Sequence, residues 1–191
     1  MKIAACILFL SILVSGALAD DIELRNASSH YLMLFYGESA MIFGSEDVRV
    51  GGGLAYAYGQ PEKRFTRGAI SGQLVSELYG DYTQSNGSQG YPPDWSIAFG
   101  GLAYARWRWP VDQHGNGLYA DLGWGLQYAN KPTLDLESQF NSTPVGGVGA
   151  FFKYADRECL VGFRYLHISN AGFKPPNYGQ NEMFFTVGVR Y

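Results

Sequence analysis

A histidine and a serine lie two positions apart near the end of the chain, within the stretch YLHISNAGFKPPNYGQN of residues 165–181. In a β-strand, residues i and i+2 point to the same face, so His167 and Ser169 are predicted to be neighbours. A serine hydroxyl becomes a competent nucleophile when an adjacent imidazole accepts its proton. The pair therefore predicts nucleophilic hydrolysis.

The surroundings of this pair are apolar. Val161, Phe163 and Tyr165 precede His167 and Ser169 at alternate positions, so all five share one face of the predicted strand. A hydrolytic pair on a hydrophobic surface would meet a lipid more readily than a polar substrate. The element that positions the pair is thus predicted to be a strand with an apolar outer face.

The first 19 residues have the pattern of a secretory signal peptide. Lys2 precedes an apolar run, and the small residues Ala17 and Ala19 follow it. A membrane anchor is the alternative, but the apolar run is shorter than the ~20 residues that a spanning helix needs. We expect cleavage after Ala19, which leaves residues 20–191 as a single domain.

Composition excludes several classes of protein. A formal net charge of −3 gives no basic face for nucleic acid. Once the signal peptide is removed, Cys159 has no intramolecular cysteine partner, so neither a disulfide scaffold nor a cysteine metal site is expected. His30 and His114 lack a partner at metal-ligand spacing, and we predict neither a metal nor a cofactor.

Alternating strands dominate the rest of the chain. Residues 94–109 and 117–129 alternate large apolar side chains with polar or small ones, and no helical period of useful length is present. Turn-forming stretches rich in Gly, Pro and Asn separate the alternating segments. We predict an all-β fold with eight strands at residues 30–42, 47–59, 68–82, 94–109, 117–129, 143–155, 158–169 and 181–191.

The same alternation is typical of a soluble sandwich or lipocalin-like barrel and of a membrane barrel. Three features of the last strand favour a membrane barrel, in which the apolar face contacts lipid. The last strand carries an apolar row that ends on a terminal aromatic residue, and its opposite face contains small residues. An eight-stranded barrel has a narrow interior that side chains must fill, so small residues are expected there. The sequence therefore predicts an eight-stranded antiparallel transmembrane β-barrel, which would lie in the bacterial outer membrane.

The final stretch GFRYLHISNAGFKPPNYGQNEMFFTVGVRY resembles the lipid A 3-O-deacylase family of outer-membrane β-barrels (PagL type). The shared motifs are an H-x-S-N-x-G core and a later P-N-x-G loop, whereas the first half of the chain matches only in architecture. The resemblance implies a serine esterase with Ser169 as nucleophile and His167 as general base. It also implies that Asn170 and the Gly172 amide hold the oxyanion.

One position departs from the family pattern. The family typically places a Glu fourteen positions after the His, where this chain has Asn181 followed by Glu182. Side chains alternate along a strand, so Asn181 falls on the lipid-facing row with Met183 and Phe185, whereas Glu182 falls on the interior row. Because a shift of one residue reverses the face, Glu182 cannot simply replace Asn181. We predict that Asn181 orients His167 through its amide oxygen. A bulge that returns Glu182 to the outer face is the alternative.

Asn181 lacks the charge that would stabilise an imidazolium, so a slower enzyme or a different substrate is expected. On the same reasoning, Asn181→Glu should equal or raise the activity.

The predicted function is removal of an ester-linked acyl chain from lipid A, with lipopolysaccharide as the partner and the outer membrane as the location. Two alternatives are a catalytically silent structural barrel and a ligand-binding or adhesion barrel. Asn181 favours the silent barrel, whereas the intact HISNAG stretch argues against both alternatives. A homo-oligomer is compatible with these features, but no pattern requires one.

Overall fold

The computed structural model describes residues 27–62, 70–87 and 92–191, so the predicted signal peptide and its cleavage site lie outside the described residues. Within these ranges no helix is long and apolar enough to cross a membrane. The strands are β1 (Ser29–Ser39), β2 (Arg49–Gly59), β3 (Ser71–Ser85), β4 (Asp94–Pro110), β5 (Gly117–Ala129), β6 (Phe140–Ser142), β7 (Val145–Tyr154), β8 (Arg157–Ile168) and β9 (Gln180–Arg190).

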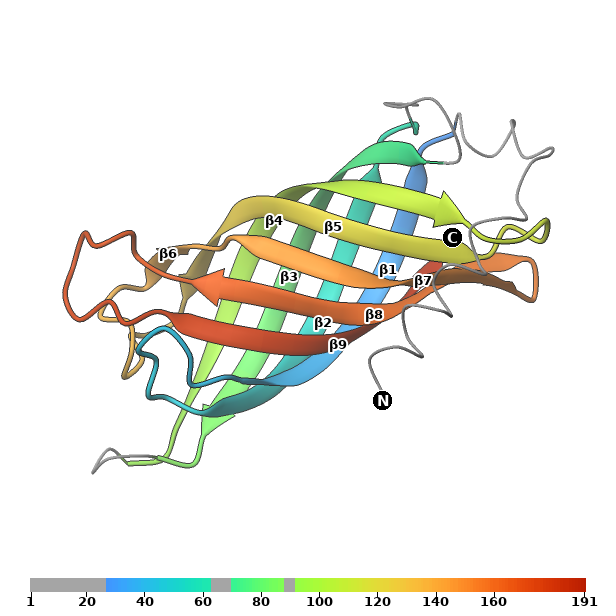
Figure 1. Ribbon diagram of the computed structural model, residues 1–191. Helices are drawn as coiled ribbons and strands as arrows, with labels where there is room; N and C mark the ends of the chain where they lie inside the picture. Colours follow the sequence, from blue (N-terminus) through green and yellow to red (C-terminus); the bar gives the residue numbers. More distant parts are fainter. Residues whose placement is uncertain (1–26, 63–69, 88–91) are drawn as a thin grey trace, which may run out of the picture.

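These strands form one closed antiparallel barrel (Figure 1). Closure comes from the β1–β9 and β4–β5 pairings. β6 and β7 both pair with β5 and are separated only by Thr143 and Pro144, so they form one interrupted stave. Proline lacks the N–H that a ladder needs, which explains the interruption. The predicted eight-stranded antiparallel barrel is thus confirmed.

Several predicted boundaries were wrong. The first strand was expected to run to residue 42 but ends at Ser39, and the third is shifted to Ser71–Ser85. The sixth was expected to begin at 143 but its first part begins at Phe140. The residues after Ser39 instead form a loop that reaches the predicted site.

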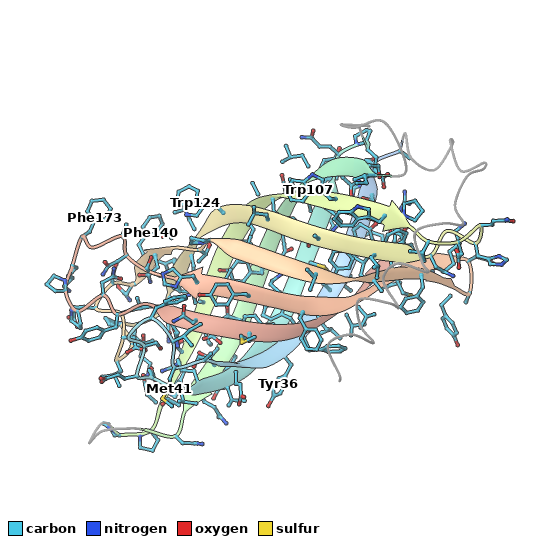
Figure 2. The ribbon with its side chains drawn as sticks, in the orientation of Figure 1. Tyr36, Met41, Trp107, Trp124, Phe140 and Phe173 are labelled. Carbon is cyan, nitrogen blue, oxygen red and sulfur yellow. The ribbon has the colours of Figure 1, made fainter. Side chains whose placement is uncertain are left out.

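Apolar side chains cover the outside of the barrel and polar ones line the inside. Leu78 and Phe163 are 69% and 66% exposed, whereas Glu77 and Arg164, one residue away on each strand, are buried. Figure 2 shows Trp124 pointing away from the wall. A soluble barrel would bury its apolar face, so this arrangement supports a barrel surrounded by lipid.

Charged pairs lie inside the barrel beside buried aromatic and aliphatic side chains such as Phe35 and Phe184. Arg164 binds both oxygens of Glu77 at 2.6 and 2.9 Å, and the Tyr104 hydroxyl donates to Glu77 at 2.9 Å. Arg106 and Asp121 form a second bidentate pair, with both distances 2.8 Å. Glu77 of β3 and Arg164 of β8 lie on strands that are not neighbours, so this pair spans the lumen, whereas Arg106 and Asp121 are opposite each other on the paired strands β4 and β5.

Interior glycines make room for the large inward-pointing rings, as the sequence predicted for a narrow barrel. A Cβ atom at Gly100 would lie 2.3 Å from the ring of Tyr79. A Cβ at Gly162 would lie 2.5 Å from the hydroxyl oxygen of Tyr119. A non-bonded carbon atom cannot approach these atoms so closely, so a side chain at either position would displace the ring.

The interior ions yield a prediction on stability. Glu77→Ala leaves the buried Arg164 guanidinium without its partner, and we expect the free energy of unfolding to fall by about 3–5 kcal/mol. The measurement is urea unfolding in detergent micelles, followed by tryptophan fluorescence. The control is Glu137→Ala, which removes an exposed ion pair with Lys174 and should cost less than about 1 kcal/mol. Equal losses in the two variants would contradict the structural role of the interior pair.

Candidate active site

The pairing of β8 with β9 positions the predicted site. In this ladder His167 lies directly opposite Asn181, and Leu166 lies opposite Glu182. Directly opposed residues share a face of the sheet, so Asn181 is on the same outward face as His167. Glu182 is 2% exposed, and its position on the ladder turns it into the barrel, so no bulge returns it to the outer face.

Asn181 contacts the imidazole of His167. Its Oδ1 atom lies 2.8 Å from His167 Nδ1, and the Tyr165 hydroxyl donates to the same oxygen at 2.6 Å. The sequence placed Tyr165 on the apolar outer face and gave no indication of this hydrogen bond. Although Asn181 is on the outward face, it is fully buried, because a loop covers it.

That loop fixes the orientation of the Asn181 side chain. Asn181 Nδ2 donates to the backbone carbonyl of Ile42 at 2.8 Å, so the amide oxygen must be the atom that faces His167. An amide oxygen only accepts hydrogen bonds, and Nδ1 must therefore carry the proton of the neutral imidazole. Nε2 is then the unprotonated nitrogen, which is the one available as a general base.

The Ile42 carbonyl belongs to a tight turn just beyond β1. Ser45 N donates to Ile42 O at 3.2 Å, and the two central residues, Phe43 and Gly44, have φ values of 57° and 94°. Two left-handed residues in succession are typical of a type I′ turn. Ala40 N also donates to the carbonyl of Asn181 at 2.7 Å, which ties the start of this loop to β9.

Ser169 follows β8 on the same face as His167. It exchanges two backbone hydrogen bonds with Ser142 of β6, and the two hydroxyl oxygens are 3.4 Å apart. Within the described part of the chain, no hydrogen bond joins the Ser169 hydroxyl to His167. Such contacts are often loose before substrate binds.

Gly179 borders the other side of the imidazole. It has φ +78°, and a Cβ there would lie 2.7 Å from His167 Cε1 and 3.4 Å from Nε2. Any side chain at this position would displace the ring, so glycine is required both by the backbone and by the imidazole.

The two predicted oxyanion donors are engaged within their own loop. The Gly172 amide donates to Asn170 Oδ1 at 3.0 Å, and Asn170 Nδ2 donates to the carbonyl of Lys174 at 2.6 Å. Asn170 is buried, and Asn177 Oδ1 accepts a hydrogen bond from its backbone N–H at 2.9 Å. In this arrangement neither donor is directed at the Ser169 hydroxyl.

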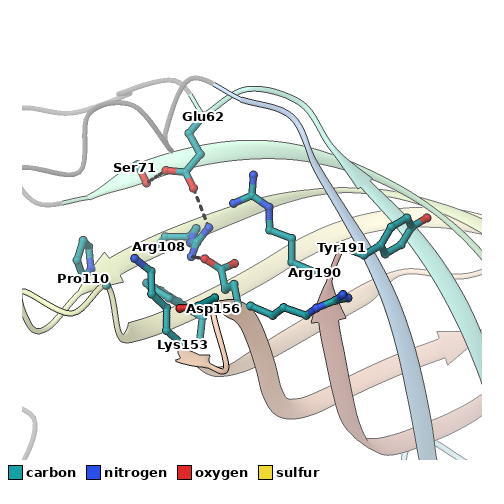
Figure 3. Close-up of a pocket in the computed structure, with 12 residues that line it drawn as sticks. Glu62, Ser71, Arg108, Pro110, Lys153, Asp156, Arg190 and Tyr191 are labelled. Atoms are coloured by element: carbon teal, nitrogen blue, oxygen red, sulfur yellow. Dashed lines mark hydrogen bonds and ion pairs between the residues drawn. The ribbon is translucent and has the colours of Figure 1, made fainter.

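A cavity of about 540 Å³ is lined by residues at the opposite end of the barrel, among them Arg108, Arg190 and Tyr191 (Figure 3). Arg108 contacts Glu62 and Glu158 there, at 2.8 and 2.7 Å. None of the predicted site residues lines this cavity. Across the described ranges, no group of three or more His, Cys, Asp or Glu side chains is arranged to hold a metal ion.

A family model and a solved barrel structure match most of this chain. The family model described as Lipid A 3-O-deacylase (PagL) matches residues 48–190. The crystal structure of the outer membrane enzyme PagL superposes with a TM-score of 0.58 at 18% identity, covering 83% of this chain and 97% of that one. The attachment invasion locus protein Ail of Yersinia pestis superposes with a TM-score of 0.46 at 14% identity, covering 86% and 97%. A search of curated proteins found no match.

The geometry around Asn181 predicts the tautomer of His167. We expect the neutral ring to carry its proton on Nδ1, as ¹⁵N NMR of labelled protein in detergent would show. The signals of His167 are assigned as those that are absent from the spectrum of the His167→Gln variant. Asn181→Ala should give a mixture of tautomers, whereas Glu182→Gln, one residue away but inside the barrel, should leave the signals unchanged. An Nε2-protonated ring in the unaltered protein would contradict the arrangement.

Proposed function

This chain belongs to the lipid A 3-O-deacylase (PagL) family, and on that premise we propose that it is an outer-membrane esterase that hydrolyses an ester-linked acyl chain of lipid A. The observation that carries the proposal is the contact between Asn181 Oδ1 and His167 Nδ1 on the outward face of the barrel. This contact leaves Nε2 as the unprotonated ring nitrogen, and Ser169 lies two residues further along on the same outward face.

The proposed reaction has two steps. His167 Nε2 accepts the proton of Ser169 as its oxygen attacks the ester carbonyl, and the imidazolium then protonates the departing sugar oxygen. An acyl-serine forms at this stage. A water molecule, deprotonated by His167, hydrolyses it and releases the fatty acid. The imidazolium formed in that step returns its proton to the Ser169 oxygen as the acyl bond breaks, which restores the free enzyme, and Asn181 holds the ring throughout.

The oxyanion role of Asn170 and Gly172 is part of the proposal. Their present hydrogen bonds lie within residues 170–174, so substrate binding must replace them with bonds to the developing oxyanion. Ala171 and Gly172 both have left-handed φ values, 54° and 79°. Strained backbone of this kind often occurs beside catalytic groups.

The surroundings of the site suit a lipid substrate. Met41, Phe140 and Phe173 are 67%, 57% and 92% exposed, and they project from the loop end of the barrel (Figure 2). In Figure 1 the C-terminus lies at the other end of the barrel. If that end faces the periplasm, as is usual for such barrels, the site lies at the outer leaflet, where lipopolysaccharide resides.

Mass spectrometry of lipid A tests the proposal. Cells that express the chain should contain lipid A lacking one ester-linked acyl chain, and cells without it should not. Ser169→Ala and His167→Ala should each abolish the change, and the double variant should lose little more, because the two groups act as a unit. Unmodified lipid A in expressing cells would support a catalytically silent barrel. Retained activity in Ser169→Ala would exclude the serine mechanism.

Residue 181 gives a second prediction. Asn181→Ala should lower kcat on the order of 100-fold, since the imidazole loses its orientation. Sequence reasoning favoured recovery in Asn181→Glu, but the Ile42 carbonyl changes that expectation. A carboxylate would place an acceptor against this carbonyl, so we expect Asn181→Glu to stay below the unaltered enzyme.

Both variants are compared with Glu182→Gln by following fatty-acid release from lipid A in one detergent. Glu182→Gln is the matched control, because it replaces a carboxylate by an amide one residue after Asn181. This variant should keep most of the activity. Full activity in Asn181→Glu would show that the Ile42 contact does not constrain the residue.

A further inference from the structure

We propose that Asp135, in the connection between β5 and β6, is a positioning residue that sets the orientation of His167 from another loop. The inference rests on the proposed function, because it assigns a role within that same site. Asp135 is fully buried although it belongs to a loop. Carboxylates are rarely buried to this extent unless they are paired, and its partners identify its role.

Three donors from the loop after β1 converge on the Asp135 carboxylate. The Ser45 hydroxyl donates to Oδ2 at 2.7 Å, Asp47 N donates to Oδ2 at 2.9 Å, and Glu46 N lies 3.0 Å from Oδ1. A carboxylate is the group that accepts from all three without presenting a donor of its own. Asp135 therefore determines where residues 45–47 lie.

Ser45 connects this anchor to the site. Its hydroxyl binds Asp135, and its backbone N–H binds the Ile42 carbonyl at 3.2 Å. The same carbonyl accepts from Asn181 Nδ2, and Asn181 Oδ1 contacts His167 Nδ1. An unbroken series of hydrogen bonds thus runs from Asp135 to the proposed catalytic base.

The backbone of the same segment holds the other side of the site. Tyr178 N donates to the Asp135 carbonyl at 3.1 Å, and Leu136 forms a β-bridge with Asn177. Asn177 Oδ1 in turn accepts from the N–H of Asn170, the residue after the proposed nucleophile. Residues 135–136 therefore link the loop that orients Asn181 with the loop that follows Ser169.

If Asp135 only stabilised the loops, the effect of removing its carboxylate would not depend on Asn181. A positioning residue acts through Asn181, and its loss should change the imidazole itself. The informative variants are Asp135→Asn, which turns one acceptor into a donor facing backbone N–H groups, and Ser45→Ala, which removes only the hydroxyl link. Glu137→Gln is the matched control, because Glu137 is an exposed carboxylate two residues away whose side chain contacts Lys174.

The first measurement is ¹⁵N NMR of His167 in detergent. We expect Asp135→Asn and Ser45→Ala to give the tautomer mixture of Asn181→Ala, while Glu137→Gln keeps the Nδ1-protonated ring. Unchanged heat-modifiable mobility in gels would show that the barrel is intact. If Asp135→Asn keeps a single Nδ1–H tautomer, the inference is overturned, whether or not the protein proves to be a deacylase. A wild-type protein that releases no fatty acid would instead refute the proposed function.

The second measurement is a double-mutant cycle on fatty-acid release. Asp135→Asn alone should lower kcat by up to about 100-fold with little change in KM, because a displaced catalytic group affects the reaction step more than binding. In an Asn181→Ala background it should cost nothing further, since no orienting amide remains to be positioned. Losses that multiply in the double variant would mean that Asp135 only stabilises the loops, and would overturn the inference.

Discussion

The register between β8 and β9 is the constraint on which the site depends, because it alone places Asn181 and not Glu182 opposite His167. A slip of one residue would exchange their faces. The barrel resists such a slip because its two faces meet different surroundings. Phe184 packs against the inward Phe35 ring with centroids 4.9 Å apart, while Met183 is exposed to the outside. Moving the strand by one residue would place the Glu182 carboxylate in lipid, which is costly.

Sequence reasoning recovered what depends on alternation. Apolar and polar side chains alternate with a period of two, and this pattern predicts the barrel, its number of strands and which side chains of β9 point outward. It also predicts that His167, Ser169 and Asn181 lie on one surface. Alternation carries no information about loops that meet through tertiary folding. Ile42 and Asn181 are far apart in the chain, and the local pattern even extended the first strand through Ile42. Gly44 was the available signal for a turn there, as Pro144 was for the break between β6 and β7. The roles of Tyr165 and Asp135 had no local signal, since their partners lie in other elements.

The loop after Ser169 is self-contained in this structure. Asn170 uses its side chain to bind Gly172 and Lys174, and its backbone N–H to bind Asn177. The donors that the family resemblance assigns to the oxyanion are therefore already satisfied. A substrate oxygen must compete with these internal bonds, and it does so best once negative charge develops, since charge-assisted hydrogen bonds are stronger than neutral ones.

Asn181 performs two tasks that a carboxylate could not combine. Its oxygen accepts from His167 and Tyr165, while its nitrogen donates to the Ile42 carbonyl. A Glu at this position would stabilise an imidazolium better, because a full charge acts strongly where water is excluded. It would also repel the carbonyl and release the turn around Phe43 and Gly44. The amide therefore lacks the charge that would stabilise an imidazolium, but it fixes the loop after β1 through the Ile42 carbonyl. Asn181 and the loop after β1 are therefore joined through the Asn181 side chain and through its backbone carbonyl.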